Sequence, residues 1–219
     1  MPVRKALVAA AFVGVLVGCS SVDPNAHVDI AKVFDVKSTF GPQFKVVTAG
    51  PSGIDPKRLS AQTLPRGTTF DPPDCARYAA GETLPPDLRG NLAGVTAEGE
   101  GNRFIAIAVE TSKRVPFDRA ITQKCKHVTF NGGTVKGAVD IVDAPHIDGA
   151  QIIGTHRVLE AKVAGAARSG ELYNYVAYLG QYIVMVTANP LIVPNQPVAP
   201  VNVQRARQLL TDAVNAVRR

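Results

Sequence analysis

Residues 1–18 limit everything that follows them, because they decide the compartment in which the chain folds. Arg4 and Lys5 form a short basic segment, Ala6–Val17 is an uncharged apolar stretch, and small Gly18 precedes a cysteine. This order of features is typical of a secretory signal peptide. As a helix, the apolar stretch covers about 18 Å, whereas the hydrocarbon core of a bilayer is about 30 Å thick. We therefore expect a signal peptide that is removed, not a permanent membrane helix.

The residues around Cys19 predict how the mature chain is held. Leu16-Val17-Gly18-Cys19 resembles the bacterial lipobox, in which the leader is cut before the cysteine and the thiol receives a diacylglyceryl group. Cys19 is then the lipidation site and the first residue of the mature protein. Residues 19–27 are polar and interrupted by a proline, as a tether would be. The predicted location is the cell membrane, lipid-anchored on its extracytoplasmic face, with residues 28–219 forming a single domain.

Two cysteines remain once Cys19 carries lipid. In an exported chain the simplest state of Cys75 and Cys125 is a disulfide. Closing a loop of about 50 residues stabilises the fold by roughly 4 kcal/mol in the chain-entropy description. A redox-active pair more often has Cys-x-x-Cys spacing, which this chain lacks. We therefore interpret the pair as structural.

The net charge is modest and spread along the sequence. It is +6 for the full chain and falls to +4 when Arg4 and Lys5 leave with the leader. Basic residues occur as separate pairs without interleaved aromatics, unlike the basic stripes that bind nucleic acids. We expect no nucleic-acid partner, whereas a weak attraction to anionic lipid or to an envelope polymer is compatible with this charge.

Hydrophobic alternation and turn signals predict a mainly antiparallel sheet. Asn131-Gly132-Gly133 lies between two candidate strands and Gly180-Gln181 between another two, and glycine accepts the positive φ that hairpin turns need. Residues 103–110 are apolar at successive positions, which indicates a central strand covered on both sides. The candidate strands are 44–48, 103–110, 126–130, 134–142, 151–163, 172–179 and 182–188.

Helical patterns accompany these strands. Residues 28–34 carry a short apolar stripe, 74–80 follow two prolines, and 116–124 begin at a proline suited to a first helical turn. Residues 87–97 predict a further small helix. The last helix begins after the capping residue Asn202. Its apolar stripe is Val203, Ala206, Leu210, Ala213, Val214 and Val217. The predicted fold class is α+β: a mainly antiparallel sheet of five or six strands with packed helices and one disulfide.

No stretch has the spacing of a known reaction centre. The chain lacks Gly-x-Ser-x-Gly, His-Glu-x-x-His, a Walker loop and a dinucleotide-binding glycine fingerprint. The histidines, which stand apart without metal-ligand spacing, are His27, His127, His146 and His156. Asp140, Asp143 and Asp148 lie near His146, and we favour loop solvation over acid–base chemistry for them. We expect no catalytic residues, no metal, no cofactor and no enzyme activity.

Four of the five tyrosines crowd one hairpin: Tyr173, Tyr175, Tyr178 and Tyr182. Tyr173 and Tyr175 share a face of their strand by period two, and Tyr178 falls on the other. Cross-strand aromatic pairing is the simpler interpretation. The alternative is an aromatic wall of a ligand groove, together with Arg157 on the neighbouring strand. Tyr173, Tyr175 and Arg157 are therefore the candidate ligand-binding residues.

The order of these features resembles small mycobacterial lipoproteins of unknown function and, more distantly, the extracellular sensor domain of a mycobacterial receptor Ser/Thr kinase. The resemblance runs from about residue 28 to the end. It is carried by Pro72-Pro73-Asp74-Cys75-Ala76, the helix that ends at Cys125, the strands around Gly180 and the terminal amphipathic helix. It implies a disulfide-stapled sheet with helices and a ligand cleft. The chain departs from the kinase in having one cysteine pair for the fold instead of two, and no kinase domain or membrane helix of its own.

Three functions stay open at this point. The preferred one is a non-catalytic, lipid-anchored ligand-binding or sensor-like module on the outer face of the cell membrane, whose ligand is a small molecule, a lipid or an envelope polymer. The second is an envelope carrier of lipid or other apolar ligands, which requires a large apolar cavity. The third is an envelope hydrolase, which requires a cleft that joins Ser or Asp to a histidine at hydrogen-bond distance.

Overall fold

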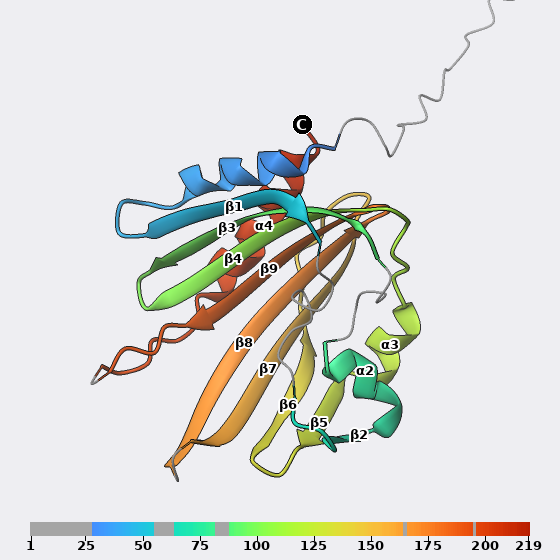
Figure 1. Ribbon diagram of the computed structural model, residues 1–219, viewed down its shortest axis with the longest axis vertical. Coiled ribbons are helices and arrows are strands. Elements are labelled where there is room, and N and C mark those ends of the chain that lie inside the picture. Colours follow the sequence, from blue (N-terminus) through green and yellow to red (C-terminus); the bar gives the residue numbers. More distant parts are fainter. Residues whose placement is uncertain (1–27, 55–63, 82–87, 164–165, 195) are drawn as a thin grey trace, which may run out of the picture.

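One antiparallel sheet forms the centre of the protein (Figure 1). The structure is a computed structural model that describes residues 28–54, 64–81, 88–163, 166–194 and 196–219. The predicted signal peptide, the lipidation site Cys19 and the tether lie outside the described residues.

Within these ranges the sheet has nine strands. In chain order they are β1 (Lys45–Gly53), β2 (Thr69–Asp71), β3 (Gly90–Gly99), β4 (Asn102–Thr111), β5 (His127–Asn131), β6 (Val135–Val142), β7 (Gln151–Val163), β8 (Ala166–Leu179) and β9 (Tyr182–Pro190). Their order across the sheet is β1-β3-β4-β9-β8-β7-β6-β5-β2. Both predicted hairpins form, with Gly133 at φ 77° and Gly180 at φ 80° in the turns.

The prediction of five or six strands was too low. A helix was expected at residues 87–97, but residues 90–97 lie in β3, which pairs with both β1 and β4. Ala93, Gly94 and Ala97 have little intrinsic strand preference, so the long-range pairing decides their conformation. A Cβ on Gly94 would lie 3.0 Å from the carbonyl oxygen of Ala106, so only a very small residue fits there without displacing its neighbour. The three-residue β2 was also missed, because so short an edge strand has no periodic signal.

Helices form at the other predicted places but with different ends: the one expected at 116–124 begins at Arg119, after the cap Asp118, and not at Pro116. They are η1 (Ile30–Thr39, a 3₁₀ helix), η2 (Pro73–Cys75), α2 (Ala76–Ala79), α3 (Arg119–Lys124) and α4 (Val203–Val217). Side-chain oxygens cap three of them, because the first N–H groups of a helix have no partner within it. Asp29 accepts from Ala31 N at 2.9 Å, Asp118 accepts from Ala120 N at 2.8 Å, and Asn202 accepts from Arg205 N at 3.0 Å.

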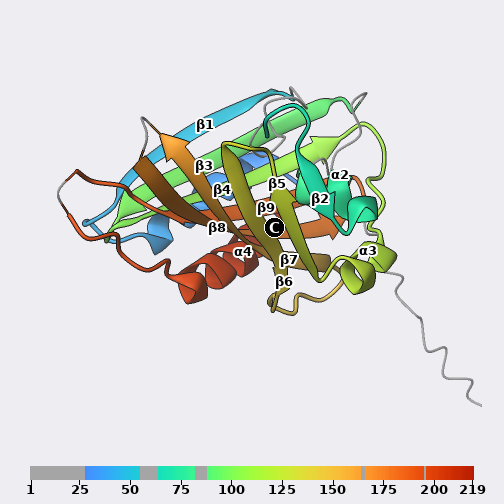
Figure 2. The ribbon, with the colours of Figure 1, turned by 90° about the horizontal axis from the view of Figure 1, so that it is seen from below.

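We call the side of the sheet that carries η1 and α4 the helix face. These two helices pack on each other and on β3, β4, β8 and β9, and Figure 2 shows them on one side of the sheet. The largest core cluster lies between the helices and the strands. Its fully buried side chains include Val33, Phe104, Tyr175, Val186, Leu210 and Val214. The predicted apolar stripe of the last helix is confirmed as the stripe that faces this core.

We call the opposite side of the sheet the disulfide face. Val109, Val176 and Ile183 form one buried cluster there, behind the strands that the helix-face core covers. β4 is therefore buried on both sides, as its sequence predicts, since Phe104 packs against the helices and Val109 against this second cluster. A third cluster surrounds Cys75 and Cys125, where η2, α2 and α3 pack on β5 and β6.

Candidate functional site

Part of the helix face extends beyond η1 and α4. Paired residues of neighbouring strands point to the same side of a sheet, so the register identifies the side chains that continue the helix face across β5, β6, β7 and the first half of β8. They are exposed or half-buried, and we call them the open patch. The open patch consists of His127, Thr129, Asn131, Lys136, Ala138, Asp140, His156, Val158, Glu160, Glu171 and Tyr173.

A row of four side chains crosses the open patch. His127 pairs with Asp140, Asp140 with His156, and His156 with Tyr173, each on the next strand. His127 Nδ1 lies 2.5 Å from Asp140 Oδ1, and His156 Nε2 lies 3.0 Å from Glu171 Oε2. The His156 ring stacks on the Tyr173 ring with centroids 4.2 Å apart and planes 13° from parallel. These contacts hold the side chains in place, so a ligand meets a preformed surface.

A hollow of about 490 Å³ lies next to this row, over β2, β5, β6 and β7. Ala138 and Val158 form its apolar floor, and Val158 is 37% exposed. Lys136 Nζ and Glu160 Oε2 close one side with an ion pair of 2.9 Å. Binding sites for small ligands occupy about 300–1,000 Å³, so the hollow is large enough for one.

The open patch and its hollow are acidic, although the chain as a whole carries a charge of +6. The charged side chains on this part of the helix face are Asp71, Asp140, Glu160, Glu171, Lys136 and Lys162. Partial burial, and after it the nearby Glu171 carboxylate, raises the pKa of Tyr173. The acidic excess favours a ligand that presents hydroxyl, amide or amino donors.

Arg157 lies on the disulfide face, so the prediction that it shares one groove with Tyr173 and Tyr175 is wrong. Arg157 pairs with Leu172, and Tyr173 pairs with the preceding residue of β7. Successive side chains of a strand point to opposite faces. The guanidinium is buried beneath α2, where Nη2 donates a hydrogen bond to the carbonyl oxygen of Ala79.

The tyrosines of the β8–β9 hairpin have different surroundings. Tyr175 is fully buried in the core beneath α4, and burial raises its pKa. Tyr178 is on the disulfide face, where its ring packs edge-on against Phe117 with centroids 5.4 Å apart. Tyr173 alone of the predicted ligand residues belongs to the open patch, and Tyr175 has the structural role that was the alternative interpretation.

The acid–histidine pairs of the open patch were not foreseen. Loop solvation was favoured for Asp140 because it is near His146 in the sequence, but Asp140 lies in β6, within the predicted strand 134–142, and faces His127. His146 instead lies 3.2 Å from Asp148, with both side chains almost fully exposed, as the solvation of a loop requires. The signal that could have found the first pair is the turn at residues 131–133, because a hairpin's loop length fixes its register.

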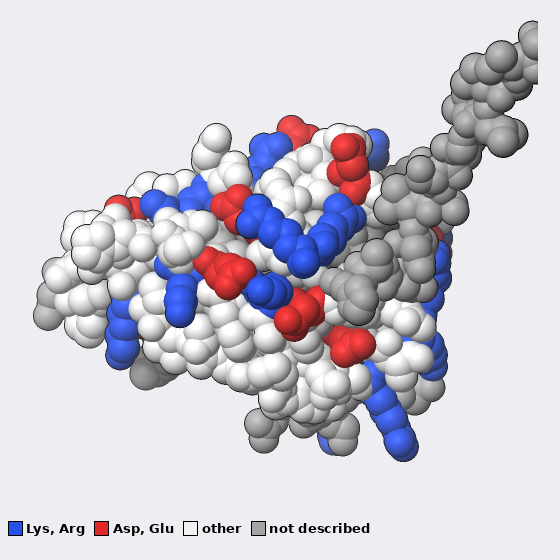
Figure 3. Space-filling view, turned by 90° about the horizontal axis from the view of Figure 1, so that it is seen from above, with Lys and Arg blue, Asp and Glu red and all other residues white. Residues whose placement is uncertain are grey.

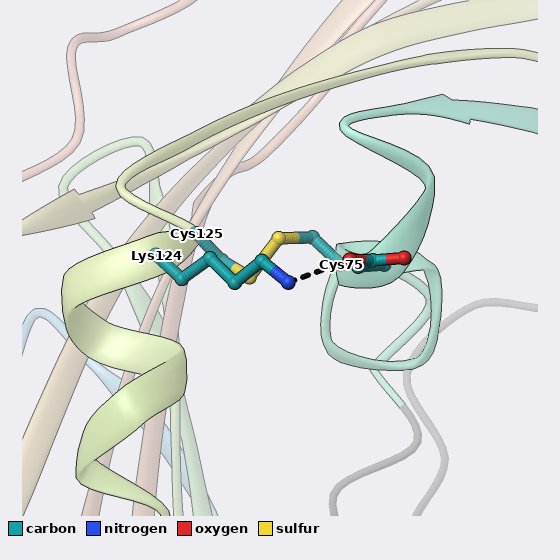
Figure 4. The surroundings of a disulfide bond; sticks show 4 residues. Cys75, Lys124 and Cys125 are labelled. Carbon is teal, nitrogen blue, oxygen red and sulfur yellow. Dashed lines mark hydrogen bonds and ion pairs between the residues drawn. A yellow bond between two sulfur atoms is a disulfide. The ribbon is translucent and has the colours of Figure 1, made fainter.

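Cys75 and Cys125 form the expected disulfide, with their Cα atoms 5.8 Å apart. Figure 4 shows that it joins η2 to the end of α3, with the Lys124 side chain reaching toward η2 beside it. The Lys124 Nζ to Asp74 Oδ2 distance is 2.6 Å, and this hydrogen-bonded cation lowers the pKa of the Asp74 carboxyl. The bond therefore fastens two short helices to each other and to the edge of the sheet.

Two further chemistries, metal binding and nucleophilic catalysis, find no support among the described residues. No group of three or more His, Cys, Asp or Glu side chains there is placed to hold a metal ion. The polar contacts of His127 and His156 within that part of the chain are to carboxylates, so neither histidine is joined to a hydroxyl or thiol nucleophile. On the side seen in Figure 3, Lys and Arg alternate with Asp and Glu instead of forming one basic surface.

Comparisons with known proteins identify relatives without an assigned activity. The family model described as a domain of unknown function (DUF5642) matches residues 29–218. An uncharacterized protein from Mycobacterium smegmatis, solved by X-ray crystallography, is 53% identical, with a TM-score of 0.82 over 88% of this chain and 98% of that one. No curated protein matches.

A second solved structure is more distant. The extracellular domain of PknH from Mycobacterium tuberculosis is 14% identical, with a TM-score of 0.38 over 88% of this chain and 93% of that one. The two matches confirm the resemblances drawn from the sequence, to a mycobacterial protein of unknown function and to a kinase's extracellular domain. At this level of similarity the second match carries no argument about function.

Proposed function

The chain belongs to the DUF5642 family, a domain of unknown function, and we propose that it is a non-catalytic ligand-binding module, lipid-anchored on the extracytoplasmic face of the cell membrane. The single observation that carries this proposal is the open patch. One half of this sheet face is buried under two helices. The other half is polar, contains a hollow and has side chains that hydrogen-bond to one another. This second half has the form of a binding surface.

The chemistry of the open patch supports a polar ligand. Its carboxylates accept hydrogen bonds, the Lys136 ammonium donates them, and the stacked rings of His156 and Tyr173 offer a flat aromatic surface. The apolar floor around Val158 suits the carbon skeleton of such a ligand. Peptidoglycan fragments combine hydroxyl, amide and amino groups with apolar ring faces, and we take them as the first probe.

The disulfide supports an extracytoplasmic location. Disulfides persist in oxidising compartments and are rare where thiols are kept reduced, and the Cys75–Cys125 bond agrees with the signal peptide predicted at residues 1–18. Among the helices of the described residues, none is long and apolar enough to cross a bilayer. Lipidation of Cys19 would hold the domain at the surface, because each buried methylene contributes about 0.8 kcal/mol and two chains give stable anchoring.

The proposal that the module is non-catalytic is based on the surroundings of its histidines. The His127–Asp140 pair meets the geometric condition set for a hydrolase, an acid joined to a histidine. Hydrolysis of an ester or amide by such a pair also needs a nucleophile that the histidine can deprotonate. The His127 side chain is 61% exposed, and its polar contact among the described residues is to the carboxylate. A water-exposed pair of this kind is suited to hydrogen bonding with a ligand.

Native mass spectrometry of the full-length protein, purified in detergent from its own envelope, tests the proposal. The chain offers a matched pair of double variants, because an exposed Lys and an exposed Val occur together both on β1 and within the open patch. K136A/V158A removes contacts of the open patch, and K45A/V47A removes the same side chains from the distant edge strand. We expect a polar, non-covalent adduct on the wild type and on K45A/V47A, and its loss from K136A/V158A.

Three outcomes would contradict the proposal. An adduct that organic solvent extracts, with the mass of a lipid, would favour the carrier function. Equal adducts on both double variants would move the site away from the open patch. A bare wild-type mass, together with no binding of a soluble peptidoglycan fragment by the same protein, would remove the reason for assigning a ligand.

A further inference from the structure

Arg157 is a buried cation without a carboxylate partner among the described residues. Its side chain is on the disulfide face and the residue is 6% exposed. Nη2 donates to the carbonyl oxygen of Ala79, and the guanidinium lies 5.9 Å from the centre of the Phe130 ring. Burial lowers its pKa from the ordinary value, with the nearby Tyr78 acting in the opposite direction. Buried charges are normally paired, because removal of an unpaired charge from water is costly.

One atom of this cation and one atom of a neighbouring tyrosine lack a hydrogen-bond partner among the described residues. Arg157 Nη1 and Tyr78 Oη are buried and have no hydrogen-bond partner within the described part of the chain. Tyr78 lies near enough to Arg157 and to Tyr178 for both to influence its pKa, which burial raises. Unpartnered buried polar atoms are rare in native proteins, and each calls for an explanation such as a bound ion or water.

The chemistry of these atoms selects the kind of occupant. Arg157 has only donors, and a tyrosine hydroxyl donates to any acceptor within reach of its O–H bond. The acceptor next to the guanidinium is the carbonyl oxygen of Ala79, which Nη2 already uses. A buried positive charge with a spare donor attracts an anion more strongly than it attracts water, since the attraction between opposite charges is much stronger in the protein interior than in bulk water.

We infer that Arg157 Nη1 and Tyr78 Oη form a buried binding site for one small anion, a halide or the carboxylate end of a small molecule, enclosed between α2 and the disulfide face of the sheet. The site is separate from the open patch, because the two lie on opposite faces of β7. The proposal gives Arg157 a ligand-binding role, although in a different place from the groove with Tyr173 that the sequence predicted.

In this proposal the α2 segment covers the site. Tyr78 and Ala79 belong to α2, whose four residues follow directly after Cys75. The disulfide fixes the start of this segment, whereas so short a helix has little stability of its own. Local opening of α2 would let the anion enter, and closing would bury it.

Thermal unfolding of the full-length protein in detergent tests the site, at constant ionic strength, with bromide, acetate and phosphate added in turn from 1 to 100 mM. An anion that binds only the folded state raises the midpoint by about 5 °C at a hundredfold excess over its Kd. We expect this rise for the wild type with bromide or acetate, and its loss in R157Q. R103Q is the matched control, because Arg103 on β4 pairs with Glu98 on β3, strands that are not neighbours of β7, and should keep the full rise.

A second variant keeps the test decisive if R157Q does not fold. Y78F retains the guanidinium and removes one donor, so its response should move to about tenfold higher anion concentration. Crystals soaked in bromide should show an anomalous peak between Nη1 and Oη. Equal rises in the wild type, R157Q and R103Q would mean a general salt effect and would overturn the inference. So would the absence of both a rise and a bromide peak, which would leave a water molecule as the occupant.

Discussion

The two halves of the sheet bury their apolar side chains in different ways. The half made of β1, β3, β4, β8 and β9, which we call the covered half, buries a large apolar cluster beneath η1 and α4. The half made of β2, β5, β6 and β7, the stapled half, has only the short helices η2, α2 and α3 among the described residues, with a cluster of six buried residues around the disulfide. Where helices are too short to bury much surface, a covalent bond holds them.

This difference also explains where the proposed ligand would bind. In the covered half β4 packs against a buried cluster on each face, so this strand leaves little sheet surface for a partner. In the stapled half the described short helices lie on the disulfide face, and no described helix covers the helix face. The described helices therefore cover the stapled half on one face, and the open patch lies on its other face.

Removal of the disulfide should give the largest effect and act on the stapled half. In C75S/C125S the unfolded chain regains the freedom of a loop of about 50 residues, so the free energy of unfolding should fall by roughly 4 kcal/mol. Denaturant unfolding measures the total loss of stability, and amide hydrogen exchange shows which strands lose it. We expect faster exchange in β5 and β6 with little change in β3 and β4. Equal acceleration in both halves would show that the comparison is wrong.

In the covered half, the largest loss of stability should come from truncation of one core side chain. Leu210 is fully buried between α4 and the sheet, so L210A should lower the free energy of unfolding by about 3 kcal/mol. Ile192 is 59% exposed, and I192A is the control with a similar loss of volume and a change within about 0.5 kcal/mol. A small effect of L210A would mean that the helices contribute little to the covered half.

Loss of a helix cap should have a smaller effect on the same half. Asn202 accepts a hydrogen bond from Arg205 N at the start of α4, so N202A should cost about 1 kcal/mol. N215A, at an exposed position of the same helix, should leave stability nearly unchanged. Chemical denaturation of both variants measures the difference, and equal values would show that the cap does not stabilise α4.

Substitution within the open patch should change binding and not stability. K136A/V158A alters exposed side chains, so its free energy of unfolding should stay within about 0.5 kcal/mol of the wild type. A larger loss, measured by the same denaturant titration, would identify the open patch as part of the structural core.

The smallest effect concerns the ion pair beside the disulfide. Lys124 lowers the pKa of Asp74 below its ordinary 3.8, so the pair stabilises the fold above that pH and loses its contribution as the pH falls through the lowered value. K124M should return the pKa of Asp74 to near its ordinary value in an NMR titration. Because both side chains are well exposed, unfolding at neutral pH should hardly change. An unchanged pKa would show that the contact does not persist in solution.

The parts of the fold that local signals specify were predicted well. The disulfide followed from the number of cysteines and the inferred compartment, the two hairpins from their glycine turns, and α4 from its apolar stripe. β3 could not be predicted, because its alanines and glycines carry no strand preference and adopt an extended conformation only when β1 and β4 lie beside them.

The candidate site was predicted only in part, because it depends on register. Period two shows that Tyr173 and Tyr175 share a face, but it does not show which residue of the neighbouring strand joins them. A shift of one residue exchanges His156 for Arg157 opposite Tyr173. The structure selects His156, so the open patch gains an imidazole and the guanidinium moves to the other face.

The most direct test of the open patch as the ligand surface is residue-resolved NMR of the full-length protein in detergent, titrated with a soluble disaccharide-peptide fragment of peptidoglycan. We predict saturable shifts of the backbone amides of Thr129, Ala138, His156 and Tyr173, with little change in η1 and α4. Shifts confined to β1, β3, β4, β9, η1 and α4, or no shifts at millimolar fragment, would contradict the assignment.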